Sequence, residues 1–246
     1  GEEERDRVSK KFPNKNVIFQ PNGVDLDKFS SGSRQSFIQQ MMLSEEDKII
    51  LCVSGFYPQK NQLVLLEAFA KSLNHLAINT SKSAKKSSVS KKACMKLILI
   101  GVIYDQDYFN EINDKISQLD IRDHVQILTQ VNFDNPLLID AYAAADLFVL
   151  PSHYETFGVV ILEAWASQTP TICGNVGGIP SFVRDGHNGA FFDTHSASDL
   201  SEKIDEVLDN TLYSTTLKNN ASETVKHYSW QEITSNLAKI YEDVSS

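Results

Sequence analysis

Two glutamates, Glu155 and Glu163, stand eight positions apart in the segment Glu155-Thr-Phe-Gly-Val-Val-Ile-Leu-Glu163. A carboxylate in such a place can accept hydrogen bonds from the paired hydroxyls of a sugar or ribose ring. The ordinary alternative is one acid that stabilises a helix N-terminus and a second acid on a solvated helix face. Apolar residues surround Glu163 on both sides, so an acid there needs a buried partner. This context favours a binding role for Glu163.

A lysine lies in a second loop with suitable chemistry, Ser54-Gly-Phe-Tyr-Pro-Gln-Lys60-Asn61. Lys60 precedes a helix-forming segment, where backbone N–H groups, the helix dipole and an ammonium together suit a phosphate. The alternative is a lysine that is merely exposed. The loop is not a Walker loop, because the pattern GxxxxGK[ST] is absent. Free N–H groups of Phe157 and Gly158, in the first turn of the next helix, would add donors for the same anion.

The elements that must position these residues alternate between short apolar runs and segments of helical period. Such runs, separated by helices, are typical of strands that are buried on both faces of a parallel sheet. We therefore expect an α/β fold with a doubly wound, Rossmann-like parallel sheet, whose ligands bind at the carboxyl ends of the strands. The expected strands are 48–53, 96–100, 125–128, 147–150, 171–173 and 190–192. One helix is expected to begin near Leu63, and the others to cover about 108–119, 137–144, 158–167 and 198–208.

The chain divides into three parts on this reading. Residues 1–45 are charged and irregular apart from 16–20 and are expected to be the tail of a part that precedes the sheet, and residues 46–210 are expected to form the Rossmann-like sheet domain. Residues 80–93, rich in lysine and serine, are expected to be a disordered insertion. A tether to nucleic acid or to anionic lipid is the alternative for this insertion. Residues 211–246 are helical in period, with an apolar stripe formed by Trp230, Ile233, Leu237, Ile240 and Tyr241.

Other candidate residues carry weaker signals. The Gly177-Gly178 turn and the Gly101–Tyr104 loop leave room for a ligand, and His153 lies in the loop of Glu155. The remaining histidines show no metal-ligand spacing, so no metal site is expected. The cysteines lie far apart without a CxxC pair, and we expect Cys52 and Cys173 to be buried free thiols in a reducing compartment.

Composition and charge exclude several classes of protein. The net charge of −9 argues against a surface that binds nucleic acid. No apolar run approaches the ~20 residues that a membrane helix needs, and the acidic first residues do not resemble a signal peptide. We expect a cytoplasmic location, with peripheral association at the cytosolic face of a membrane left open for the full-length protein.

Taken in order, these loops resemble the C-terminal, nucleotide-sugar-binding half of retaining glycosyltransferases of group 1 (family 4), which have the GT-B fold. The most specific element is the E-x7-E motif, Glu155 to Glu163, which follows Val149-Leu-Pro-Ser152. The other matching segments are Pro21-Asn-Gly-Val-Asp25, Pro58-Gln-Lys60-Asn, Ala145-Asp-Leu-Phe, Val176-Gly-Gly-Ile-Pro180, Asp185-Gly-His-Asn-Gly189 and Tyr228-Ser-Trp230.

The resemblance implies roles for individual residues. Glu155 would approach the transferred sugar and act in catalysis with Lys60, which would hold the diphosphate together with backbone groups from Thr156 to Val159, including Phe157 and Gly158. Glu163 would bind the ribose hydroxyls, and backbone groups near Gln130 and Val131 would contact the base. The family works without a bound metal, so no cofactor is implied. The donor would be a nucleoside-diphosphate sugar, UDP- or GDP-linked.

Two departures from the family pattern bear on activity. Gly55 stands where the family usually has an arginine that contacts the diphosphate, and Ser181 stands where a glutamate often follows Ile-Pro. The resemblance therefore implies the donor half of a hexosyltransferase-type enzyme (EC 2.4), inactive without its N-terminal acceptor domain. The alternatives are a catalytically impaired nucleotide-sugar-binding or scaffolding relative and, less favoured, a nucleotide-sugar epimerase of related fold.

Overall fold

Six parallel strands form the centre of the molecule in the computed structural model, which describes residues 2–83 and 95–245. Their order across the sheet is β3-β2-β1-β4-β5-β6. The strands are β1 (Lys48–Val53), β2 (Met95–Ile100), β3 (Val125–Leu128), β4 (Leu147–Leu150), β5 (Thr171–Gly174) and β6 (Ala190–Phe192). The predicted α/β fold with a doubly wound parallel sheet is confirmed, because every neighbouring pair runs parallel.

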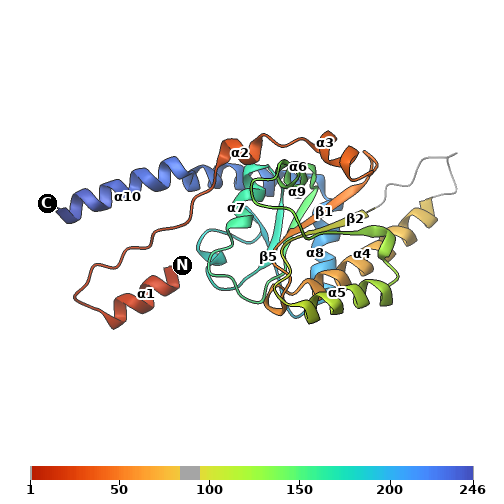
Figure 1. Cartoon of the computed structure of the whole chain (residues 1–246), viewed down its shortest axis with the longest axis horizontal. Helices are drawn as coiled ribbons and strands as arrows, with labels where there is room; N and C mark the ends of the chain where they lie inside the picture. The colour runs from red at the N-terminus through yellow and green to blue at the C-terminus, as the bar shows by residue number, and fades with distance from the viewer. Residues whose placement is uncertain (1, 84–94, 246) are drawn as a thin grey trace.

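Helices cover both faces of this sheet (Figure 1). Alternate residues of β1 point to opposite faces, so Ile49 and Leu51 enter one apolar core while Ile50 and Cys52 enter the other. The first core lies against α2 (Leu26–Ser30), α3 (Arg34–Gln40), α6 (Pro136–Ala144) and α7 (Val159–Ala166). The second core lies against α4 (Gln62–Ser83), α5 (Gln106–Gln118) and α8 (Ala197–Asp209).

The expectation that residues 1–45 are irregular is wrong for much of this stretch. It contains α1 (Glu2–Lys11), α2 and α3, whereas 16–20 forms no regular element. Phe29 and Phe37 are buried in the first core. The side chains of Asp25 and Ser33 cap α2 and α3 by accepting from the backbone N–H groups of Lys28 and Ser36. Helices this short carry too little periodicity to be recognised, although their caps are typical.

The first four residues of the predicted insertion at 80–93 are helical. Residues 80–83 belong to α4, and the rest of the predicted insertion lies outside the described residues. Helix α4 therefore continues further than the apolar spacing from Leu63 to Leu73 indicates.

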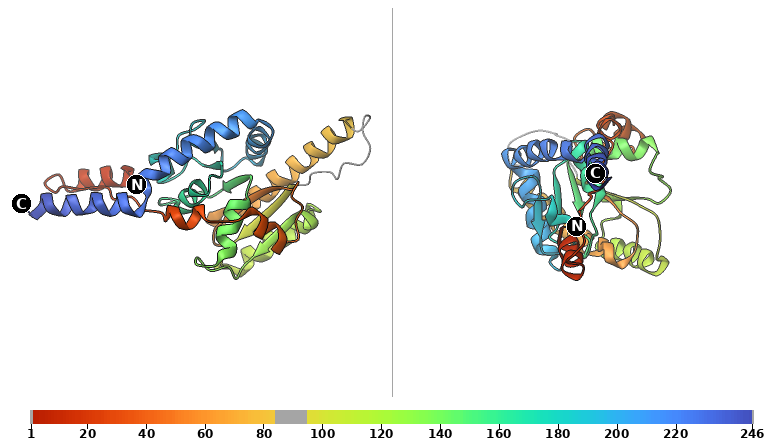
Figure 2. Two further views of the ribbon diagram at one scale, coloured as in Figure 1. Left: turned by 90° about the horizontal axis from the view of Figure 1, so that it is seen from above. Right: turned by 90° about the vertical axis from the view of Figure 1, so that its left-hand side faces the viewer.

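The C-terminal stretch is helical as predicted and forms α9 (Thr211–Val225) and α10 (Trp230–Ser245). Helix α9 buries Leu217, Ala221 and Val225 against the body. Helix α10 extends away from the sheet (Figures 1 and 2). Of its apolar stripe, Ile233 is buried, whereas Trp230 and Tyr241 are 50% and 65% exposed.

Asp146 ties the start of the central strands to α3. Its carboxylate accepts from the backbone N–H of Ile49 at 2.9 Å and from Lys48 Nζ at 3.0 Å, and it faces Arg34 Nη1 at 3.3 Å. Its own N–H donates to the Ile49 carbonyl at 2.8 Å. This carboxylate therefore fixes the register at which β1 and β4 begin.

We expect Asp146→Ala to lower the free energy of unfolding by about 1–3 kcal/mol, because the N–H of Ile49 and two cations lose their acceptor. Urea unfolding at neutral pH measures the change. Asp114→Ala is the matched control, since Asp114 is exposed on α5 and its loss should change stability by no more than about 0.5 kcal/mol. Equal stability of the two variants would contradict the role given to Asp146.

Candidate active site

The loops that follow β1 and β4 meet because these two strands are neighbours in the sheet. Lys60, at the end of the 3-10 turn η1 (Pro58–Lys60), places its Nζ 2.5 Å from Oε1 of Glu155. Both side chains are nearly buried, with 14% and 10% exposed. The structure thus brings together the two residues that the sequence predicts to act in catalysis.

Neighbouring polar groups hold this ion pair in place. Ser152 Oγ donates to the same Glu155 oxygen at 2.7 Å. Asn61, in a left-handed conformation with φ of 56°, donates from Nδ2 to the carbonyls of Pro151 and Thr194 at 3.1 and 2.9 Å. Gln59 exchanges two further bonds with the backbone of His153 and Tyr154. Sequence reasoning assigned no site role to Ser152 or Asn61, although both lie inside quoted motifs.

The amides that follow Glu155 are available to a ligand. Among the described residues, no acceptor is bonded to the backbone N–H of Thr156, Phe157 or Gly158. Gly158 caps α7 with φ of +88°, a left-handed conformation that favours glycine, and Val159 is the first helical residue. Phe157 is buried while Thr156 is exposed. These amides belong to the stretch from Thr156 to Val159 to which the resemblance assigns the diphosphate.

The Gly177-Gly178 turn supports the Glu155 loop and does not open a space for a ligand. A Cβ on Gly177 would lie 1.9 Å from the Glu155 carbonyl oxygen, and one on Gly178 would lie 2.0 Å from that of Thr156. The Gly178 N–H donates to the Glu155 carbonyl at 2.9 Å. These glycines therefore allow two backbones to touch.

Glu163 has the buried environment that the sequence predicts. It lies on α7, is 5% exposed, and accepts a 2.7 Å hydrogen bond at Oε2 from the Tyr142 hydroxyl. Burial raises the pKa of Glu163, while the Tyr142 hydrogen bond and the charge of Lys28 act in the opposite direction. Burial also raises the pKa of Tyr142 well above its usual value, and the nearby Glu163 adds to the shift.

The predicted base-contact residues follow β3 at the same edge of the sheet. Gln130 is exposed, and Val131 packs at the margin of the first core. Lys28 anchors this loop by donating to the Phe133 carbonyl at 3.1 Å and to Asp134 at 3.0 Å, with its Nζ 3.5 Å from the centroid of the Phe133 ring. None of these contacts joins Gln130 or Val131 to Glu155 or Glu163.

Gly55 lies under an aromatic ring. A Cβ on Gly55 would lie 2.6 Å from Cδ2 of Tyr104, whose side chain follows β2 and is 73% exposed. Tyr104 meets the Tyr57 ring edge-on at 5.8 Å, and Lys60 Nζ lies 5.6 Å from the Tyr57 centroid. The place where a side chain at position 55 would begin is therefore filled by Tyr104, a contact that the sequence pattern does not reveal.

His153 lies apart from the ion pair. Its ring stacks on His195 at 4.8 Å, and its Nδ1 lies 3.3 Å from Thr194 Oγ1. Burial lowers the pKa of His153, and the charge of His195 adds to this shift. Cys52 and Cys173 are buried free thiols, as predicted, and burial raises the pKa of Cys52 to about 12.

The described residues contain no group of three metal-ligating side chains and no helix long and apolar enough to cross a membrane. Positive charge at this site comes from Lys60, from free amides and from the N-terminus of α7. An anion that needs cationic and N–H partners beside a carboxylate fits this chemistry.

Comparison with known proteins identifies the family. The family model "Glycosyl transferases group 1" matches residues 33–224. A D-inositol 3-phosphate glycosyltransferase of Mycolicibacterium smegmatis is 32% identical over 208 residues, which cover 85% of this chain and 43% of that protein. The chain thus spans less than half the length of this curated relative.

Solved structures share the fold. HepE of Anabaena, in complex with UDP and glucose, matches with a TM-score of 0.75 at 24% identity over 93% of this chain and 57% of its own. The C-terminal domain of the group 1 glycosyl transferase LpcC from Francisella tularensis matches with a TM-score of 0.68 at 22% identity, over 85% of this chain and 100% of its own. With the family model matching most of its length, the chain belongs to the group 1 glycosyltransferases.

Proposed function

We propose that this chain is the donor-binding half of a retaining, metal-independent glycosyltransferase that uses a nucleoside-diphosphate hexose. The observation that carries the proposal is the Lys60–Glu155 pair beside the free amides of Phe157 and Gly158. A diphosphate would take Lys60 and these amides as partners, which stabilise the charge that develops on the leaving group. Transfer itself would need an acceptor-binding half beyond this chain.

The remaining residues have roles consistent with one bound donor. Glu155 would face the transferred sugar, and Glu163 would accept hydrogen bonds from the ribose hydroxyls. Gln130 and Val131, after β3, would contact the base through their backbone. HepE, a structural relative, binds UDP and glucose, which supports a uracil nucleotide as the first donor to test.

A catalytically impaired, nucleotide-sugar-binding relative is the second candidate. Gly55 supplies no cation, and the ring of Tyr104 covers its Cα. Lys60 is a point charge, which cannot replace the two parallel hydrogen bonds of a guanidinium. The two candidates share the binding site and differ in the rate of transfer.

Calorimetric titration with UDP, GDP and ADP tests the proposal, and we expect one of them to bind. Glu163→Gln should weaken that binding about tenfold, because the ribose loses a charged acceptor. Glu202→Gln, on the exposed face of α8, is the matched control and should leave the affinity unchanged. Absence of binding by all three nucleotides, or equal affinity of Glu163→Gln and the wild type, would contradict the assignment.

The same substitution should make the free protein more stable at neutral pH. Because the pKa of Glu163 is raised in the folded state, the folded protein holds this proton more tightly than the unfolded chain does. The stability that the protonated form contributes is therefore lost as the pH rises from the ordinary glutamate pKa of 4.5 through the raised pKa of Glu163. Glutamine, which cannot ionise, avoids this loss and can still accept from Tyr142.

Thermal unfolding at pH 4 and pH 7 measures this effect, with nucleotide absent. We expect the stability gained by Glu163→Gln to be larger at pH 7 than at pH 4, and Glu202→Gln to show no such difference. A gain that is independent of pH would indicate that glutamine packs better and that ionisation of Glu163 has no part in it.

Gly55→Arg tests whether the proposed diphosphate site lacks a cation at position 55. The new side chain collides with the Tyr104 ring, so we expect the full effect in the double variant Gly55→Arg/Tyr104→Ala. Relative to Tyr104→Ala, the double variant should bind the diphosphate about tenfold more tightly through a charge-assisted pair, with no gain for the nucleoside alone. Equal diphosphate affinities would show that position 55 does not face the phosphates.

A further inference from the structure

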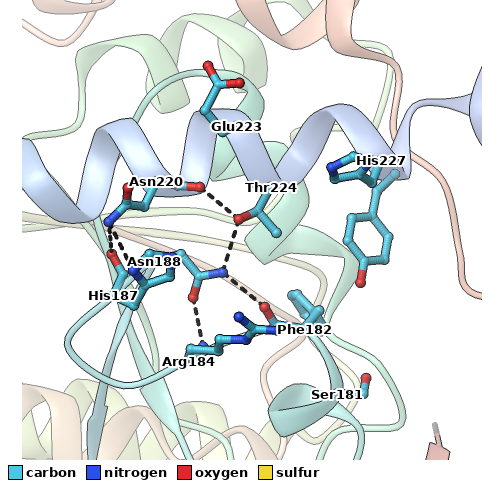
Figure 3. A pocket seen from close by; sticks show the side chains of 10 residues that line it. Ser181, Phe182, Arg184, His187, Asn188, Asn220, Glu223, Thr224 and His227 are labelled. Atoms are coloured by element: carbon cyan, nitrogen blue, oxygen red, sulfur yellow. Dashed lines mark hydrogen bonds between the residues drawn. The ribbon is translucent and has the colours of Figure 1, made fainter.

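A cavity of about 400 Å³ lies between the turn at 184–189, in the segment that joins β5 to β6, and helix α9 (Figure 3). The turn contributes Arg184 and His187, and α9 with the following turn contributes Asn220 and His227. Neither Lys60 nor Glu155 lines it. The cavity is thus separate from the proposed donor site.

One guanidinium, that of Arg184, and one carboxylate, that of Glu223, line this cavity. Among the described residues, no hydrogen bond or ion pair holds the Arg184 guanidinium. The nearby acid, Glu223, is already occupied, because both of its oxygens accept from Lys226 Nζ at 2.7 Å. Figure 3 shows the Glu223 carboxylate on the far side of α9 from Arg184. A cation without a counter-ion therefore lines the cavity.

The groups around Arg184 are held in place before any ligand arrives. Asn188 is 2% exposed, and its Oδ1 accepts from the Arg184 N–H at 2.7 Å. Its Nδ2 donates to the Phe182 carbonyl at 3.0 Å and to Thr224 Oγ1 at 3.2 Å. The buried side-chain amide of Asn188 thus joins the turn that carries Arg184 to α9, so the turn loses little conformational entropy when a ligand binds.

His187, on the same turn as Arg184, supplies a second donor and is held by α9. Asn220 Nδ2 donates to both Nδ1 and the carbonyl oxygen of His187, at 3.1 and 3.0 Å. With Nδ1 used as an acceptor, the neutral His187 ring carries its proton on Nε2. The lining therefore contains an imidazole N–H donor as well as a guanidinium, and His227 adds a further imidazole.

We propose that this cavity binds the phosphate monoester of a small polar molecule. A guanidinium pairs two phosphoryl oxygens at once, and the imidazole donors can reach the third. A cavity of about 400 Å³ exceeds the needs of a bare phosphate and leaves room for a polyol beside the amide of Asn220 and the hydroxyl of Ser181.

The cavity is also connected to the donor loop. Phe182, one of its lining residues, stacks on Phe157 with ring centroids 4.8 Å apart. Ser181 Oγ donates to the Gly178 carbonyl at 2.6 Å, and the Gly178 N–H holds the Glu155 carbonyl. An occupant of the cavity would therefore contact the structure that supports Glu155.

Titration of the whole chain with inorganic phosphate and with glycerol 1-phosphate, followed by amide chemical shifts, tests the proposal. The largest shifts should fall at 184–189 and 220–228, and should persist when UDP is present in saturating amount. Arg184→Gln should weaken binding of glycerol 1-phosphate about tenfold. Arg122→Gln is the matched control, since Arg122 lies in the 3-10 turn η2 (Arg122–His124) before β3 and donates to the Asn113 carbonyl.

Three results would overturn the proposal. Equal affinities of Arg184→Gln and the wild type would remove Arg184 from the site. Shifts confined to the loop at 54–60 and abolished by UDP would place the phosphate in the donor site. Binding to vesicles that contain phosphatidic acid, without any response to glycerol 1-phosphate, would indicate a lipid headgroup and contradict a small polar ligand. Because Arg184 is exposed, its substitution should leave the thermal unfolding temperature unchanged.

Discussion

The ion pair between Lys60 and Glu155 is the interaction on which the site depends, and it can form only because β1 and β4 are neighbouring parallel strands. The two residues are 95 positions apart in the chain. A parallel sheet brings the carboxyl ends of its strands to one edge, so both loops arrive at the same place. Asp146 fixes where β1 and β4 begin, and thereby also where they end.

A nearly buried ion pair is favourable only when its remaining hydrogen-bonding groups are satisfied, because both ions give up water. Ser152 supplies one such bond to Glu155. The Gly178 N–H holds the backbone of the Glu155 loop. Asn61 holds the Lys60 loop by donating to the carbonyls of Pro151 and Thr194. Gly178 and Asn61 of the Gly-Gly and Lys-Asn motifs thus support the backbone of the loops that carry Glu155 and Lys60.

The sequence indicates the sheet and the central pair of the site, because both follow from patterns that are local in the chain. Continuous apolar runs predict buried strands, and residues directly after such runs lie at the sheet edge, as Lys60 and Glu155 do. The partner of Glu163 could not be predicted, since Tyr142 belongs to an apolar helix whose pattern indicates only core. The ring of Tyr104 over Gly55 depends on the packing of two loops, about which residue spacing carries no information.

The N-terminus of α7 bears on how a site with a single lysine could bind the proposed diphosphate. In the free protein the charge of Lys60 is matched by Glu155, so the pair by itself attracts an anion only weakly. A serine or aspartate cap at position 158 would bond to an amide inside the first turn of α7 and remove that donor. Gly158 has no side chain to do so, and the N–H groups of Phe157 and Gly158, which lie just before the helix, are without partners among the described residues. With Gly55 supplying no cation, these amides and the helix dipole would be the main attraction beyond Lys60 for the phosphates of the proposed donor. The glycine in the E-x7-E segment is therefore as much a part of the proposed anion site as the two acids that define the motif.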